Sequence, residues 1–128
     1  MQIGLFILVG LGFWPHFTMA DEASNSGAEL YQTHCLSCHQ FDGGGVPMQQ
    51  PELINGYYTM GPTGELIQFV LEGTASRENW DSEWQNRMPA FDFLDDKQLS
   101  TVLTYIRNNF SNKGSAISEA DVKNIRDK

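Results

Sequence analysis

The sequence predicts an all-α fold, and three features support that prediction. Apolar residues recur at intervals of three and four in the second half of the chain, which is the spacing of one face of a helix. Residues that commonly cap helices stand directly before these stretches. No segment alternates convincingly between apolar and polar residues, as a half-buried strand would. We therefore expect about four to five short helices and no sheet.

The first 20 residues have the features of a secretory signal peptide. An apolar run from Ile3 to Trp14 leads to the small-residue site Thr18-Met19-Ala20, and acidic sequence begins at Asp21. The run is shorter than the ~20 apolar residues that a membrane span requires. We expect cleavage during export, which leaves residues 21–128 as one domain. An uncleaved N-terminus that anchors the protein to a membrane is the alternative.

A short helix and an irregular loop are expected in the first half of this domain. The helix covers 26–32, and its Gly27 lies one turn before Tyr31 on the same face, where a glycine allows another helix to approach closely. A loop follows from residue 42, because three successive glycines and two prolines cannot sustain a helix. It ends in a turn at Asn55-Gly56. The apolar residues available for packing in this loop are Leu53 and Ile54.

The next helix is expected over 63–73. Thr63 is its capping residue and Gly73 ends it. A long polar loop then covers 74–87. The apolar residues that fall at helical spacing in this helix are Leu66, Ile67, Val70 and Leu71.

The strongest helix pattern covers 95–110, and a shorter helix follows it to about Arg126. Asp95 with Gln98 predicts a capping box at the start of the first, and Ser118 with Asp121 predicts one at the start of the second. The apolar face of the long helix comprises Leu99, Val102, Leu103, Ile106 and Phe110. The pair placed to form a hydrophobic staple on the short helix is Ile117 and Val122.

Five consecutive residues, Cys35-Leu36-Ser37-Cys38-His39, indicate the chemistry. Two cysteines separated by two residues and followed at once by histidine are the attachment signal for covalently bound haem c. Each thiol can add across one vinyl group of the porphyrin, and the histidine then offers an imidazole nitrogen to the iron. We therefore predict one haem c, held through Cys35 and Cys38, with His39 as an axial ligand.

Other uses of a cysteine pair fit the sequence less well. A structural zinc site needs about two further Cys or His ligands, and the remaining histidines are His16 and His34, which directly precedes Cys35. A thioredoxin-like redox pair belongs to a βαβ context, and the sequence shows no strand pattern around this motif. A disulfide that closes so short a loop removes little chain entropy.

An iron that only carries electrons needs a sixth ligand, and methionine sulfur is the soft ligand that raises its potential. Met88 is the best candidate, because it lies 49 residues after His39 in the sequence Met88-Pro89-Ala90-Phe91, where Pro89 stiffens the loop. Met60 is possible, whereas Met48 is nine residues from His39 and poorly placed to reach the opposite face. The alternative role for Met88 is to fill a gap in the core.

The formal net charge is −8, and all eight Lys and Arg lie at or after Arg77. This balance argues against nucleic acid as a partner. The acidic surface either serves solubility or steers the protein towards a basic patch on a partner. Six polar residues are candidate hydrogen-bond donors to the haem propionates: Tyr57, Tyr58, Arg77, Trp80, Trp84 and Arg87.

The mature chain resembles class I c-type cytochromes of the small bacterial mono-haem kind. The resemblance covers most of residues 21–128, and the segments that carry it are Gly27–Tyr31, Cys35–His39, Gly43–Gly45, Pro51–Leu53, Met88–Phe91 and Leu94–Arg107. Residues 114–126 resemble extensions on cytochrome subunits that serve periplasmic dehydrogenases and copper nitrite reductases.

The resemblance implies the class I cytochrome c fold around one haem, with the first and last core helices crossing near Gly27, Tyr31 and Tyr105. It also implies that the Pro51 carbonyl accepts the Nδ1–H of the haem histidine, which fixes the tautomer that presents Nε2 to iron. Leu53 is expected to contact the cofactor from the same loop.

We therefore expect a periplasmic one-electron carrier rather than an enzyme, because no small-molecule substrate can reach an iron with both axial positions filled. Its partners would be a dehydrogenase, a reductase or a terminal oxidase. A tightly bound cytochrome c subunit of a periplasmic dehydrogenase or reductase is the first alternative. An alternative of another class is a haem enzyme or gas sensor with an open sixth site.

Overall fold

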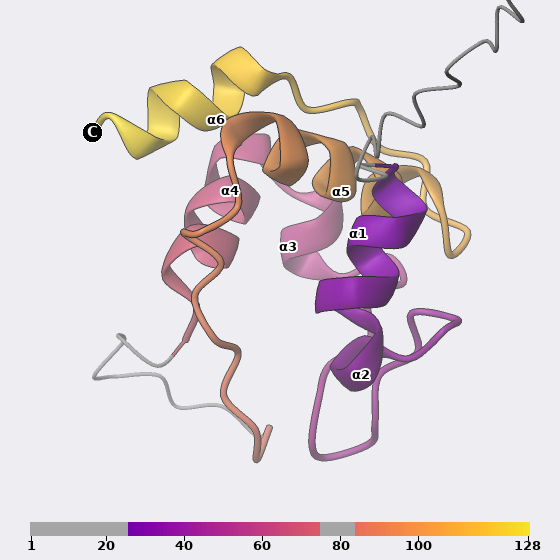
Figure 1. The fold of residues 1–128 in the computed structure, drawn as a ribbon. Coiled ribbons are helices and arrows are strands. Elements are labelled where there is room, and N and C mark those ends of the chain that lie inside the picture. Colours follow the sequence, from indigo (N-terminus) through magenta and orange to yellow (C-terminus); the bar gives the residue numbers. More distant parts are fainter. Residues whose placement is uncertain (1–25, 75–83) are drawn as a thin grey trace, which may run out of the picture.

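The computed structural model describes residues 26–74 and 84–128 and shows an all-α fold (Figure 1). The predicted fold class is confirmed, and the described residues contain no strand beyond one isolated bridge between Val46 and Gln50. Residues 1–20 and the candidates Arg77 and Trp80 lie outside the described residues. The six helices of the described part are α1 (Gly27–His34), α2 (Leu36–His39), α3 (Tyr57–Met60), α4 (Thr63–Glu72), α5 (Asp96–Asn108) and α6 (Glu119–Arg126).

The crossing of α1 and α5 forms the centre of the fold. Leu30 and Tyr31 of α1 are buried against the apolar face of α5, and the rings of Tyr31 and Tyr105 lie 5.7 Å apart. A Cβ atom added to Gly27 would overlap Cβ of Tyr105, so only glycine lets the two backbones approach this closely. The predicted crossing near these three residues is confirmed.

The helix starts show which parts of the sequence prediction hold. The capping boxes of Asp95 with Gln98 and of Ser118 with Asp121 are both formed. A third capping box, of Ser26 with Glu29, starts α1. The prediction that Thr63 caps its helix is wrong, because the residue in the capping position is Pro62, which has no side-chain acceptor. Helix α4 nevertheless begins at Thr63, and its first turn is closed by Leu66 N, which donates to Pro62 O at 3.2 Å.

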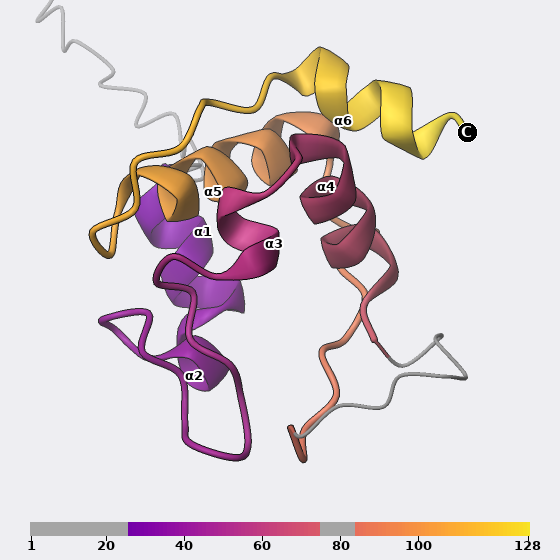
Figure 2. The ribbon, with the colours of Figure 1, turned by 180° about the vertical axis from the view of Figure 1, so that it is seen from behind.

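Helix α6 packs across both α4 and α5 (Figures 1 and 2). Val122 is fully buried, and Ile117 joins it in the core, as expected for the predicted staple. Thr104 of α5 fixes the approach to α6, because its Oγ1 donates to Ile117 O and accepts from Ile117 N. In the described part of the chain, no helix has the length and apolar character needed to cross a membrane.

Two buried polar side chains connect the end of α5 to α3 and to the loop between α2 and α3. Asn112 donates to Leu53 O at 3.0 Å and accepts from Asn55 N at 2.7 Å. Arg107 is 4% exposed and donates to the carbonyls of Thr59 and Ser115 at 2.7 and 2.9 Å. Because buried polar groups are costly unless paired, these bonds fix where the loop runs. The loop is thereby held in place at the edge of the cavity described next.

Candidate functional site

A cavity of about 540 Å³ lies between two parts of the chain. In both ribbon views α2 and the loop that follows it run along one side, and the segment leading into α5 runs along the other (Figures 1 and 2). Residues from both sides line the cavity, together with apolar side chains of α4 and α5. All six candidate site residues are among the lining residues: Cys35, Cys38, His39, Pro51, Leu53 and Met88.

The one-turn helix α2 brings both cysteines and the histidine to the same wall. His39 N donates to Cys35 O at 2.9 Å, and this bond closes the turn. Residues three and four positions apart share a face of a helix, so Cys35 lies beside both Cys38 and His39. Both cysteines are free thiols. Burial, and then the nearby charge of Cys38, raise the pKa of the Cys35 thiol to about 12.

His39 is buried and held by its ring nitrogen Nδ1. That atom lies 3.0 Å from Pro51 O, at hydrogen-bond distance. The bond orients the ring and leaves Nε2 available to a ligand in the cavity. Burial lowers the pKa of His39, and the bond to Pro51 opposes that shift in part. The Tyr31 hydroxyl secures the end of the motif by donating to Gln40 O at 2.7 Å.

Met88 enters the cavity from a loop that is fastened to the end of α4. Its N–H donates to Thr74 Oγ1 at 2.8 Å, and Thr74 N–H donates back to Met88 O at 2.9 Å. The next point of attachment is Phe91, whose N–H donates to Val70 O at 3.0 Å. Gly73 has φ +65°, and a Cβ atom there would lie 2.6 Å from Met88 O. A side chain at Gly73 would therefore push away the segment from Met88 to Asp95, which we call the methionine loop.

Sequence reasoning did not find the role of Gly73 and Thr74. Gly73 was recognised only as a helix end. Its second requirement, contact with the backbone of a segment 15 residues later, leaves no local pattern. Thr74 is 3% exposed, and a buried threonine beyond a helix end is a usable signal only once burial is known.

The structure separates the other candidate residues into those that line the cavity and those that do not. Met48 is 60% exposed, and neither it nor Met60 is among the residues that line the cavity. The loop that carries Met48 instead helps to close the rim, because the carbonyls of Met48 and Gln49 accept from Gln85 N and Asn86 N. The described candidates for propionate contact that line the cavity are Tyr57, Tyr58, Trp84 and Arg87. Arg87 already donates to Thr74 O at 3.1 Å.

Comparison with known proteins decides the family. The profile of the family described as "Cytochrome c" matches residues 24–110. The chain belongs to the cytochrome c family. Members carry electrons and bind haem iron, so electron transfer is the function of this cytochrome domain.

Similar curated proteins are larger cytochrome subunits. The cytochrome c subunit of a quinone alcohol dehydrogenase from Gluconacetobacter polyoxogenes is 32% identical over 109 residues, which is 82% of this chain and 23% of that protein. The fructose dehydrogenase cytochrome subunit of Gluconobacter japonicus is 31% identical, over 80% of this chain and 22% of that subunit. The gluconate 2-dehydrogenase cytochrome c subunit of Pantoea cypripedii is 30% identical, over 80% and 24%. The chain thus spans about a quarter of the length of these relatives.

The cavity of this cytochrome fits a haem. It offers two thiols and an imidazole on one wall, a thioether from the other segment, and apolar side chains between them. Its wall also holds a buried polar atom, Gln50 Oε1, with no hydrogen-bond partner in the described part of the chain. Among the described residues, no cluster of three or more His, Cys, Asp or Glu is arranged for a different metal ion.

Proposed function

We propose that the chain binds one haem c through thioether bonds to Cys35 and Cys38, with His39 and Met88 as the axial ligands of its iron. The observation that carries this proposal is the convergence of all four side chains on one cavity from segments about 50 residues apart. The bond between His39 and Pro51 supports it, because that bond leaves Nε2 free for a metal.

The bound haem supplies a one-electron couple of its iron, and the protein side chains set the conditions for it. Pro51 and Thr74 keep the two ligand segments in place. The apolar wall, to which Leu53 contributes, disfavours additional charge inside the cavity. With both axial positions filled by protein, no substrate binds at iron. We therefore propose that the chain is a carrier of electrons and has no catalytic centre of its own.

The relatives favour a dehydrogenase as the redox partner. All three relatives described above are cytochrome subunits of dehydrogenases. We propose that this chain exchanges electrons with such an enzyme in the periplasm, either as a free carrier or as a bound subunit. A free carrier with a net charge of −8 should associate weakly and release its partner as salt screens the attraction. A subunit should remain with its enzyme at moderate salt, so co-purification at increasing salt separates the two forms.

The decisive test is the visible spectrum of the exported, haem-loaded protein before and after carbon monoxide is added to its reduced form. We expect a c-type spectrum that carbon monoxide changes only slowly, because Met88 occupies the sixth position and must leave it before carbon monoxide can bind. Met88→Ala should bind carbon monoxide at once. A wild-type protein that binds carbon monoxide equally fast would overturn the axial assignment and favour the gas sensor or enzyme. Intact mass of the exported protein, with or without residues 1–20, tests the periplasmic placement against a membrane anchor.

A further inference from the structure

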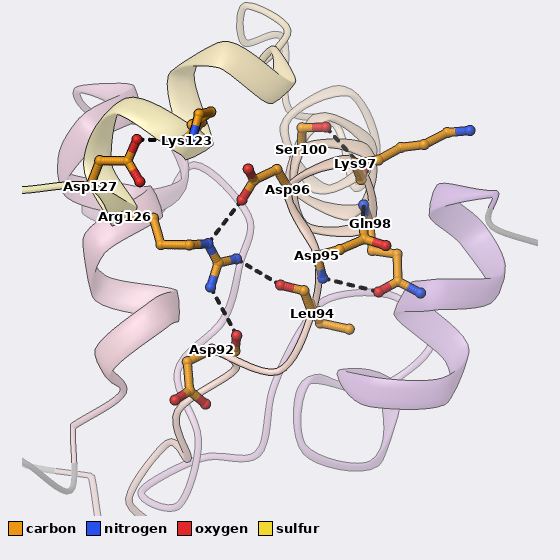
Figure 3. Close-up of polar contacts among 10 residues, drawn as sticks. All are labelled: Asp92, Leu94, Asp95, Asp96, Lys97, Gln98, Ser100, Lys123, Arg126 and Asp127. Carbon is orange, nitrogen blue, oxygen red and sulfur yellow. Dashed lines mark hydrogen bonds and ion pairs between the residues drawn. The ribbon is translucent and has the colours of Figure 1, made fainter.

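Helix α6 ends in an arginine that reaches the segment between Met88 and α5 (Figure 3). Arg126 donates through Nη1 to Asp92 O at 2.9 Å and through Nη2 to Leu94 O at 2.7 Å. Its Nε lies 2.9 Å from Oδ1 of Asp96, in the first turn of α5. One guanidinium therefore contacts two backbone carbonyls of the loop and one carboxylate of the helix that follows. Hydrogen bonds from a charged donor of this kind are the stronger ones in proteins.

These contacts lie at the second end of the methionine loop. Thr74 holds the loop at Met88 itself, and Val70 O holds it at Phe91. Asp92 and Phe93, the next two residues, have exposed side chains, and the Phe93 ring contacts the rings of His34 and Phe91. Arg126 attaches the backbone at Asp92, whose side chain is exposed, and again at Leu94, whose side chain is already in the core.

The position of the Arg126 guanidinium follows from the packing of α6 as a whole and not from a flexible side chain alone. Val122 is fully buried one turn earlier, and Ile125 packs against the core beside Gly64 of α4. The side chains of Arg126 and Asp96 are only 31% and 30% exposed, so solvent screens their attraction less than it would at a free surface. Lys123, on the same helix, offers a contrast: it pairs with Asp127, and both side chains are more than 60% exposed.

We propose that Arg126 is a positioning residue for the axial methionine: α6 closes the methionine loop from its downstream end and thereby keeps Met88 on the iron. This inference rests on the proposed ligation by Met88. Helix α6 lies beyond residues 24–110, the part of the chain that the family profile matches.

The experiment measures how often Met88 leaves the iron in the haem-loaded, reduced protein. At saturating carbon monoxide the rate of binding becomes equal to the rate at which the sixth position opens. Four proteins are compared: wild type, Arg126→Gln, Lys123→Gln as the control that removes the same charge from the same helix, and Met88→Ala as the reference for an open site. The melting temperature of each protein is measured alongside.

We expect Arg126→Gln to raise the limiting rate about tenfold, the change expected when hydrogen bonds from a charged group to the loop are lost. Lys123→Gln should bind at the wild-type rate, and Met88→Ala should show no limiting rate. An Arg126→Gln protein that melts earlier yet opens at the wild-type rate would show a merely structural arginine and overturn the proposal. An equal rise for Lys123→Gln would overturn it too, as an effect of surface charge. If Met88→Ala behaved like wild type, the ligand assignment itself would fail instead.

Discussion

The Thr74 hydroxyl accepts the hydrogen bond that holds Met88 beside the cavity, so replacing that hydroxyl tests this side of the site. In Thr74→Val the side chain keeps its shape, but the partly buried Met88 N–H loses its acceptor. We expect the free energy of unfolding of the haem-loaded protein to fall by about 1–3 kcal/mol, the usual cost of a buried donor without a partner. Denaturant titration followed by far-UV circular dichroism measures it.

Thr33→Val is the matched control for Thr74→Val. Thr33 lies at the exposed rim of the cavity, and its hydroxyl donates to Glu29 O within its own helix, so water can replace that bond. We expect a change within about 0.5 kcal/mol, as for most surface substitutions. Equal losses at the two threonines would show that the bond from Met88 to Thr74 adds no stability.

For single residues, the sequence predicts those that would bind the haem better than it predicts those that hold them in place. The motif Cys35–His39 predicts three residues of one wall, because its spacing has a chemical reason that does not depend on the fold. The threonine that holds Met88 was not predictable, since 14 residues separate the two and a hydroxyl that accepts one backbone bond has no characteristic neighbours.

Replacing Gly27 tests how closely helices α1 and α5 cross. Alanine is the better helix former by about 1 kcal/mol, yet its Cβ atom would overlap Cβ of Tyr105 and lie 3.0 Å from Thr101 O. Both of those atoms belong to a rigid part of α5, so the helices must separate. We expect Gly27→Ala to lower the free energy of unfolding by about 1–3 kcal/mol, the usual cost of overpacking.

Gly64→Ala in α4 is the matched control for Gly27→Ala. There the new Cβ atom would meet only the flexible end of Ile125, at an ordinary contact distance of 3.4 Å. We expect unchanged or slightly increased stability, because the gain in helix propensity of up to about 1 kcal/mol remains. A destabilised Gly64→Ala protein beside an unchanged Gly27→Ala protein would contradict the close crossing.

The start of α6 has a pH dependence of its own. The Asp121 carboxylate accepts hydrogen bonds from Ser118 Oγ and N, and these bonds lower the pKa of Asp121 below its ordinary value. The capping box therefore contributes fully above about pH 4, the ordinary range of an aspartate, and its contribution is lost as the pH falls through the lowered pKa. A ¹³C NMR titration should give Asp121 a depressed midpoint that rises in Ser118→Ala. An unchanged midpoint in that variant would exclude the hydroxyl as the cause.

The elements that the sequence predicts well are those with local signals at both ends. The capping boxes at Asp95 and Ser118 depend only on residues three apart, and both are formed. The one-turn helix α3 was not predicted, because four residues offer no apolar period and their helical bonds depend on the loop that Asn112 and Arg107 hold. Thr63 shows the converse: a suitable capping residue one position late does not cap.

The placement of α6 could not be predicted at the scale of the whole molecule. Its own sequence predicts an amphipathic helix, but the choice of α4 and α5 as its neighbours follows from the shapes that those helices present once packed. The cavity is likewise a property of the assembled chain. Its walls come from α1, α2, α3, α4, α5 and two loops, and the segment that completes it is contacted by Arg126 near the end of the chain.

This assembly predicts that the protein depends on its haem to fold. A cavity lined largely by apolar side chains and about 540 Å³ in volume is too large for a domain of this size to keep empty. Leaving so much apolar surface in contact with water is unfavourable, and the net stability of a small domain is only about 5–15 kcal/mol. The cavity must therefore be filled or collapse. Neither the bond of His39 to Pro51 nor that of Met88 to Thr74 crosses the cavity, so these bonds do not hold its two walls apart.

Protein in which both Cys35 and Cys38 are replaced by serine, produced without haem, should accordingly show weak near-ultraviolet circular dichroism and no cooperative thermal transition. The haem-loaded wild type should melt cooperatively. The same double variant mixed with free haem separates two contributions: partial recovery of a cooperative transition would reflect filling of the cavity, and the remaining difference would reflect the covalent bonds. A sharp transition in the haem-free protein would show that the helices support the cavity alone, and the dependence on haem would be wrong.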